Sequence, residues 1–435
     1  MEEQNIGKYI KSTRCFDGER NRREMKLLDF IDRSPTAYQA VENIRKELLE
    51  NGALELDEAC TWQIEPGKTY VVTRNGSALT AFCVPENAQD VRVFAAHADS
   101  PSFKLKEHPE IVVEEKYVKL NVEAYGGMLM STWFDRPLSV AGRIIVKQDG
   151  RMVAKLVNVD RDLLIIPSVC IHMNREANNG YKYNVQTDLL PLFSVQEGGK
   201  AGRGAFMKLV AECAGVQPED ILGQDLFLYV REKGRVWGAD GEFISAPHID
   251  DLECAYAGLQ GFLNGRKERH IAVLSVFDNE EVGSRSIQGA GSTFLRDVLE
   301  RIGVTKEMVA NSLLFSADNG HALHPNHPEL TDPTNRPILN GGVLLKYAAR
   351  LSYATDGMAA ALFKDICRAA DVPYQIFFNR SDIQGGGTLG AVSTAQVPFL
   401  TADIGLAQLA MHSAYETAGA KDYDYMVKAA GELFA

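Results

Sequence analysis

Four short apolar runs in this chain are each followed at once by polar side chains. The runs and the side chains that follow them are 91–96 with His97 and Asp99, 271–277 with Glu280 and Glu281, 313–317 with Asp318, and 376–378 with Arg380 and Asp382. Such runs, alternating with helical stretches, predict an α/β domain with a mixed, largely parallel sheet flanked by helices. Ligands bind beyond the carboxyl ends of the strands in such sheets, so the pattern predicts one site at one sheet edge.

The pattern of apolar and polar residues changes between about residue 107 and residue 237. Alternating runs such as 117–122 and 141–146 predict half-buried strands there, whereas the spacing of apolar residues in 24–52 predicts two helices. A chain of 435 residues exceeds what one simple core usually holds. We therefore expect an α/β domain in two parts, 1–106 and 238–435, interrupted by a β-rich insert over 107–237.

Composition excludes several classes of partner. The chain has 46 Lys and Arg against 58 Asp and Glu, a formal charge of −12, and no basic run interleaved with aromatic residues, so nucleic acid is not expected. The sequence has no run of about 18 apolar residues, so no membrane span is expected, and its first residues do not resemble an apolar leader. Seven scattered cysteines without a CxxC pair predict no disulfide framework. We expect a cytoplasmic protein.

The side chains expected at the sheet edge are histidines and carboxylates. The sequence has no GxSxG element and no recognisable catalytic cysteine context. Imidazole and carboxylate suit zinc, and also manganese or cobalt. The candidate ligands are His97, Asp250, Glu281, Asp318 and His412. Five ligands are too many for one tetrahedral catalytic zinc, but two ions that share one carboxylate would use all five.

Each candidate also has an ordinary structural interpretation. Asp250 stands at a predicted helix start, where a carboxylate caps the helix, and Glu280 and Glu281 could form a similar acidic pair. His97 could be a structural histidine, although Asp99 nearby could fix its tautomer, as a carboxylate often does for a metal-ligating imidazole. Adjacent glutamates also permit one to bind metal while the other accepts a proton. These alternatives stay open for each residue taken alone.

Taken together, the motifs HADSP, HIDDL, DNEEVGS, SADNGHALHPN and MHS, in this order, resemble the aspartyl aminopeptidase family, which includes the vacuolar aminopeptidase I type. The resemblance spans about residues 25–430. It implies a zinc exopeptidase fold with a β-rich dimerisation domain inserted in the catalytic domain. It also implies assembly from dimers into tetrahedral dodecamers, and peptide substrates with a free N-terminus.

The resemblance implies a role for each residue that matches a motif. Two zinc ions per subunit would be held by His97 and Asp318, by Glu281 and His412, and by Asp250 as the bridge. Glu280 would be the general base and Asp99 would orient His97. Two departures stand out: Asp251 replaces an asparagine common in relatives, and residues 385–387 are all glycine. Neither departure touches the five ligands.

The family name also suggests substrates with an acidic N-terminal residue. The expected substrate contacts are His172, His324, Lys346, Arg380 and Asp382. Among these, His172 lies in the insert and matches a family histidine that reaches a neighbouring subunit's site.

Two other functions remain open at this stage. A dimetal amidohydrolase or deacylase could use the same ligands, and a requirement for a free amine would distinguish it. A catalytically silent assembly protein with the same fold would be favoured by loss of a ligand or of Glu280, but all six positions are intact.

Overall fold

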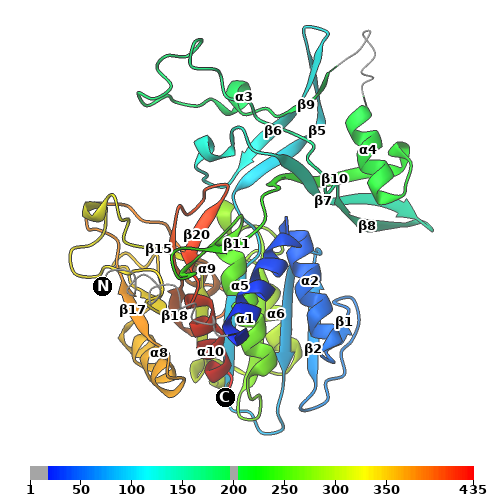
Figure 1. The fold of residues 1–435 in the computed structure, drawn as a ribbon. Coiled ribbons are helices and arrows are strands. Elements are labelled where there is room, and N and C mark those ends of the chain that lie inside the picture. The colour runs from blue at the N-terminus through cyan, green and yellow to red at the C-terminus, as the bar shows by residue number, and fades with distance from the viewer. Residues whose placement is uncertain (1–17, 196–203) are drawn as a thin grey trace, which may run out of the picture.

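The computed structural model describes residues 18–195 and 204–435 (Figure 1). Its larger part contains a nine-stranded sheet. In spatial order the strands are β1 (Leu54–Leu56), β2 (Thr69–Arg74), β3 (Ala78–Cys83), β13 (Ile271–Phe277), β4 (Val91–His97), β14 (Leu313–Ala317), β18 (Leu400–Gly405), β16 (Val343–Lys346) and β17 (Tyr374–Phe377). Strands β13, β4, β14 and β18 form a parallel block, and β3 and β16 run antiparallel to it. The predicted α/β fold is confirmed.

Helices cover both faces of this sheet. One face packs against α1 (Gly18–Asp32), α2 (Ala37–Glu50), α5 (Ile249–Asn264), α8 (Gly357–Ala369) and α10 (Asp422–Leu433). The other packs against α6 (Phe294–Arg301), α7 (Lys306–Ala310) and α9 (Leu389–Ser393). Within β4, Phe94 joins the first core and Val93 the second, which explains why the run is apolar throughout. No helix in the described ranges combines the length and apolar character that a membrane span needs.

A second, antiparallel sheet lies above the first in Figure 1. In spatial order its strands are β8 (Arg151–Asn158), β7 (Leu138–Gln148), β10 (Ile221–Val230), β5 (Ser102–Val113), β6 (Tyr117–Tyr125) and β9 (Leu192–Val195), with helices α3 (Val185–Asp188) and α4 (Ala205–Ala214) beside it. It has a core of its own. Along β6, buried Val118, Leu120 and Val122 alternate with more exposed residues, the half-buried pattern that the sequence predicts. We call these strands the inserted sheet; the limits 107 and 237 stay predictions.

A small third sheet lies beside the nine-stranded sheet. Its strands are β11 (Arg235–Trp237), β12 (Phe243–Ala246), β20 (Glu416–Gly419), β19 (Ala407–Leu409) and β15 (Gly320–His321). Short 3-10 helices are η2 (Met130–Trp133), η3 (Pro218–Asp220), η4 (Glu280–Val282) and η5 (Pro328–Leu330). The third sheet matters for function because the loop after β19 carries His412 and β20 begins with Glu416.

Candidate metal centre

Three neighbouring parallel strands bring their polar ends together. His97 is the last residue of β4, Glu280 and Glu281 follow β13, and Asp318 follows β14. Strand β4 lies between β13 and β14, with Phe277 paired to His97. The carboxyl ends of these strands therefore meet at one place, as the sequence pattern predicts. Asp250 at the start of α5 and His412 in the loop after β19 complete the group.

Asp250 lies between the two histidines. Its Oδ1 is 3.7 Å from Nε2 of His97, and its Oδ2 is 3.5 Å from Nε2 of His412. The same His412 nitrogen is 3.3 Å from Oε1 of Glu281. One carboxylate thus faces two imidazoles with its two oxygens, which is the arrangement that a bridge between two ions requires.

Three groups of potential ligand atoms, each with its atoms within 4.8 Å of one another, overlap at this place. They are His97 with Asp250 and Asp251, His97 with Glu280 and Glu281, and Asp250 with Glu281 and His412. Asp318 is outside these three groups, although it is buried and the charges of Asp250 and His97 both influence its pKa. Its Oδ1 lies 3.7 Å from Nζ of Lys346.

Asp250 Oδ1 shows whether the site fits a cation. This atom is buried and has no hydrogen-bond partner, although an unpaired buried carboxylate oxygen is costly. Oδ1 of Asp251 is in the same condition. Helix α5 begins after His248, and no side chain caps it, so the carboxylate of Asp250 is not used as a helix cap. The set of imidazole and carboxylate donors suits zinc.

The electrostatics of the cluster show an excess of buried negative charge. Burial raises the pKa of Glu280 to about 8, and the charge of Asp318 adds to this rise. Burial likewise raises the pKa of Asp318 to about 6. Burial and the charge of Asp250 raise the pKa of Glu281 well above its usual range. Each carboxylate resists ionisation because it is buried and because other carboxylates lie nearby, and divalent cations would offset that cost.

The pKa values of the two histidines are also raised, but in a histidine this favours the charged form. Burial alone lowers the pKa of His97, but the negative charges of Asp251 and Asp99 outweigh it and raise the pKa well above the usual value. Burial also opposes protonation of His412, yet its hydrogen bond to Asp250 and the charge of Glu281 raise its pKa to about 10. Positive charge is therefore strongly favoured at the places where both Nε2 atoms face carboxylates.

Asp99 fixes His97 and also anchors the next strand end. Nδ1 of His97 lies 3.0 Å from the Asp99 carbonyl oxygen, so an Nδ1–H donor leaves Nε2 free to face Asp250. The Asp99 carboxylate accepts the backbone N–H groups of Glu280 at 3.1 Å and of Glu281 at 3.2 Å. One aspartate thus holds both neighbouring strand ends in place.

Glu416 is a supporting residue that the sequence did not suggest. Its two carboxylate oxygens accept the backbone N–H of Asp250 at 3.0 Å and that of His412 at 2.7 Å. Burial raises its pKa to about 8, and the charge of Asp250 contributes. The only sequence signal is a lone acid four residues after His412, which by itself does not point to a site.

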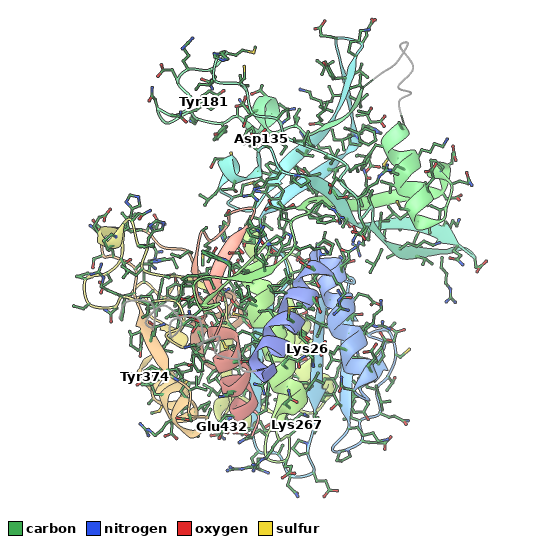
Figure 2. All side chains as sticks on the ribbon, viewed as in Figure 1. Lys26, Asp135, Tyr181, Lys267, Tyr374 and Glu432 are labelled. Atoms are coloured by element: carbon green, nitrogen blue, oxygen red, sulfur yellow. The ribbon has the colours of Figure 1, made fainter. Side chains whose placement is uncertain are left out.

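Of the five expected substrate contacts, Lys346 borders this cluster and the other four lie away from it. Lys346 is 2% exposed, and its Nζ donates to the carbonyl of Asn319 at 2.7 Å beside Asp318. The other four lie on loops. Arg380 donates to Asp382 at 2.9 and 2.7 Å, and His324 and His172 are exposed, the latter in a turn between β8 and α3. Figure 2 shows that segment at Tyr181, projecting away from the nine-stranded sheet.

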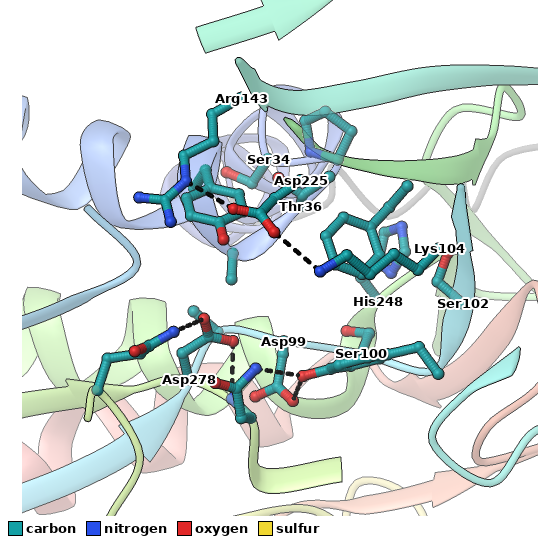
Figure 3. Close-up of a pocket in the computed structure, with 18 of the residues that line it drawn as sticks. Ser34, Thr36, Asp99, Ser100, Ser102, Lys104, Arg143, Asp225, His248 and Asp278 are labelled. Atoms are coloured by element: carbon teal, nitrogen blue, oxygen red, sulfur yellow. Dashed lines mark hydrogen bonds and ion pairs between the residues drawn. The ribbon is translucent and has the colours of Figure 1, made fainter. Parts of the chain in front are cut away.

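A polar cavity of about 220 Å³ lies behind Asp99, between the two larger sheets (Figure 3). Asp99 and Asp278 line one side of it, and a chain of ion pairs lines the other. In that chain Asp225 accepts from Lys104 at 2.8 Å and from Arg143 at 2.9 Å. The cavity is therefore a polar seam between the inserted sheet and the candidate metal centre.

Comparison with known proteins identifies relatives over almost the whole chain. The family described as "Aminopeptidase I zinc metalloprotease (M18)" matches residues 30–434. A probable M18 family aminopeptidase 2 of Clostridium acetobutylicum is 42% identical over 422 residues, covering 94% of this chain and 98% of that protein. A protein of the same description from Pseudomonas aeruginosa is 36% identical over 419 residues, covering 94% and 97%.

Solved structures are similar over the same extent. The mApe1 dodecamer of S. cerevisiae superposes with a TM-score of 0.84 at 28% identity, covering 96% of this chain and 97% of that one. Ape4 in its complex with Nbr1 gives a TM-score of 0.91 at 34% identity, covering 96% and 86%. The resemblance inferred from the five motifs is confirmed. Because the family match covers nearly the whole chain, the protein belongs to the M18 family of zinc metalloproteases and is an aminopeptidase of that family.

Proposed function

We propose that the enzyme removes the N-terminal residue of peptides with two co-catalytic zinc ions. His97 and Asp318 would hold one ion, Glu281 and His412 the other, and Asp250 both. The observation that carries this proposal is the position of Asp250, whose two oxygens face the two imidazoles while Oδ1 has no hydrogen-bond partner. When bound, the ions would polarise the scissile carbonyl and lower the pKa of water.

Glu280 is the proposed general base. The ligand assignment leaves Glu280 and Asp251 free, but Oδ2 of Asp251 already accepts the backbone N–H of His97 at 3.2 Å, whereas Glu280 lies beside Glu281 and near His97. Its role would be to take a proton from the attacking water and to return it to the leaving amine. Asp99 supports this role because it accepts the backbone N–H of Glu280 at 3.1 Å.

We extend the proposal to substrates with an acidic N-terminal residue. Lys346 and Arg380 are the cations proposed to bind the carboxylate of such a substrate. His324 and Asp382 are further proposed substrate contacts. In the structure Lys346 is bonded to Asn319 and Arg380 to Asp382. Recognition of a substrate carboxylate would therefore need one of these cations to exchange its partner. A kinetic preference for leucyl over aspartyl and glutamyl substrates would reject this part.

We also propose that the protein forms a homo-oligomer built from dimers. The dependence of activity on His172 is its simplest test. The supporting observations are the dodecamer named for the yeast relative and the exposed turn that carries His172 between Ile171 and Met173, which are 49% and 82% exposed. His172 would contact substrate in a neighbouring subunit. A cytoplasmic location is proposed as well, supported by the free thiols of the six cysteines in the described residues.

A comparison of matched peptides tests the proposed reaction. The enzyme should release the first residue of a peptide with a free α-amine and should leave the N-acetylated form of the same peptide intact. Chelation should abolish the reaction, and zinc should restore it. Efficient cleavage of the acetylated form would instead indicate a deacylase that uses the same ligands.

A further inference from the structure

Tyr125, the last residue of β6, extends from the inserted sheet into the candidate metal centre. Its hydroxyl lies 2.7 Å from Oδ2 of Asp99 and 2.8 Å from Nδ2 of Asn279. Tyr125 lies outside the five sequence motifs. Through this side chain the inserted sheet contacts the Asp99 carboxylate, whose Oδ1 lies 3.4 Å from Nδ1 of His97.

The direction of these hydrogen bonds follows from the chemistry of the partners. The amide nitrogen of Asn279 can only donate, so the phenol oxygen accepts from it. The phenol hydrogen is then available for the carboxylate of Asp99, which can only accept when ionised. A charge-assisted bond of this kind is stronger than one between neutral groups.

Asp99 transmits this contact to the catalytic groups. Oδ2 of Asp99, which accepts from Tyr125, also accepts the backbone N–H of Glu281 at 3.2 Å, and Oδ1 accepts that of Glu280. A shift of the carboxylate would move the proposed base and one ligand together. It would also disturb His97, whose Nδ1 lies 3.4 Å from Oδ1 of the same carboxylate.

The surroundings hold Tyr125 in this position. Its ring packs edge-on against Phe227 of β10, with the ring centroids 5.4 Å apart, and its backbone is paired with Ser102 of β5. The next residue, Gly126, has a φ of +76°, and a Cβ there would lie 3.1 Å from Cβ of Glu281. The end of β6 therefore packs so closely against Glu281 that a side chain larger than that of glycine would crowd the contact.

We propose that Tyr125 is a positioning residue for the reaction, supplied by the inserted sheet of the same subunit. Its hydroxyl holds the Asp99 carboxylate, which in turn holds His97 and the backbone of Glu280 and Glu281. This inference rests on the proposed metal-ligand and base assignments. It gives the inserted sheet a role in the site of its own chain, separate from any contact between subunits.

The Tyr125→Phe variant tests the proposal because it removes only the hydroxyl and keeps the ring against Phe227. Removal of a group that supports a metal ligand typically costs about 10- to 100-fold in metal affinity or activity. We expect zinc affinity, measured by competition with a chelator, and kcat to fall by about that factor. KM should change by less than about twofold, because the hydroxyl contacts Asp99 and Asn279 and is not one of the proposed substrate contacts.

Tyr229→Phe is the matched control. Tyr229 is a buried tyrosine of the same inserted sheet, whereas Tyr125 is half-buried, and the Tyr229 hydroxyl donates to Asn158 at 2.7 Å, away from Asp99. This variant should keep wild-type zinc affinity and kcat. Equal losses in both variants, or an unchanged zinc affinity in Tyr125→Phe, would overturn the proposal. The wild-type protein in the same assays tests the two-zinc assignment separately, since its metal content and activity do not depend on Tyr125 being a positioning residue.

Discussion

Asp250 is the residue at which a metal bridge and an ordinary helix start make different demands. A capping aspartate would accept backbone N–H groups of α5, yet its Oδ1 has no partner and its Oδ2 faces His412. The backbone N–H of Asp250 is itself held by Glu416. Glu416 thus fixes the backbone of Asp250, and both carboxylate oxygens of Asp250 face the cluster.

We therefore expect Asp250→Ala to lose both metal ions, because a bridging carboxylate contributes to each of them. Metal analysis of the purified variant measures this directly. The control is Asp240→Ala, which removes an exposed acid that lies ten residues earlier and outside the cluster. Two equivalents retained in Asp250→Ala would place the bridge at another residue.

Glu280 and Glu281 are adjacent but should respond differently to the same substitution. Glu280→Gln should keep its metal and lose about 10²- to 10⁴-fold in turnover, the usual contribution of a general acid–base group. Glu281→Gln should bind metal more weakly, because an amide oxygen is a poorer ligand than a carboxylate. Single-turnover rates and metal content separate the two effects. If the phenotypes are exchanged, the assignments of base and ligand are exchanged with them.

At the scale of elements, the strand ends could be predicted because each one leaves a local pattern. An apolar run followed by His97 or by Glu280 and Glu281 is visible within a few residues. Tyr125 could not be found in this way, because an aromatic residue at a strand end is common, and it meets Asn279 across 154 residues of sequence. Glu416 reaches Asp250 across 166 residues. Contacts of this range depend on how the sheets pack, which one sequence does not show.

Lys346 illustrates a different limit of the sequence. Its charge suggested an accessible cation for a substrate carboxylate. The strand that carries it, β16, is buried throughout, and its ammonium group is bonded to Asn319 and lies beside Asp318. A sequence gives the charge of a side chain but not the partners that the fold supplies.

The strand-end cluster predicts how the metal-free protein responds to pH. Burial raises the pKa of both Glu280 and Glu416 to about 8 in the metal-free fold, above the usual 4.5. A raised pKa means that the folded state binds more protons than the unfolded state. The contribution of these two carboxylates to folding stability is therefore present at low pH and is lost as pH rises towards about 8. We expect the Tm of the metal-free protein to fall across this range. The zinc-loaded protein should change less, because the ions neutralise the carboxylates. Parallel Tm curves for the two forms would contradict this electrostatic account.

At the scale of the whole molecule, the proposed role of His172 makes oligomerisation part of catalysis. The turn that carries it projects from the inserted sheet and is exposed in the single chain. His172→Ala should therefore bind metal normally but be nearly inactive. His108→Ala is a suitable control, because His108 is an exposed histidine on β5 of the same sheet.

Mixed assemblies test whether His172 acts across subunits. A hybrid of His172→Ala and Glu280→Gln chains contains a site with intact Glu280 from the first chain and intact His172 from the second. Activity should partly return in such hybrids although each parent is inactive. Hybrids that stay inactive, while wild-type subunits reassembled in the same way recover, would show that His172 does not serve a neighbouring site.

The dependence of aminopeptidase activity on zinc stoichiometry tests the central claim most directly. Metal-free enzyme would be titrated with zinc while the release of the first residue from a peptide with a free amine is followed. Five ligands, of which Asp250 is the bridge, predict that activity becomes maximal only at about two zinc ions per chain. The metal content at that point should be the same. Full activity at one ion per chain, with the second position empty, would contradict the two-metal account.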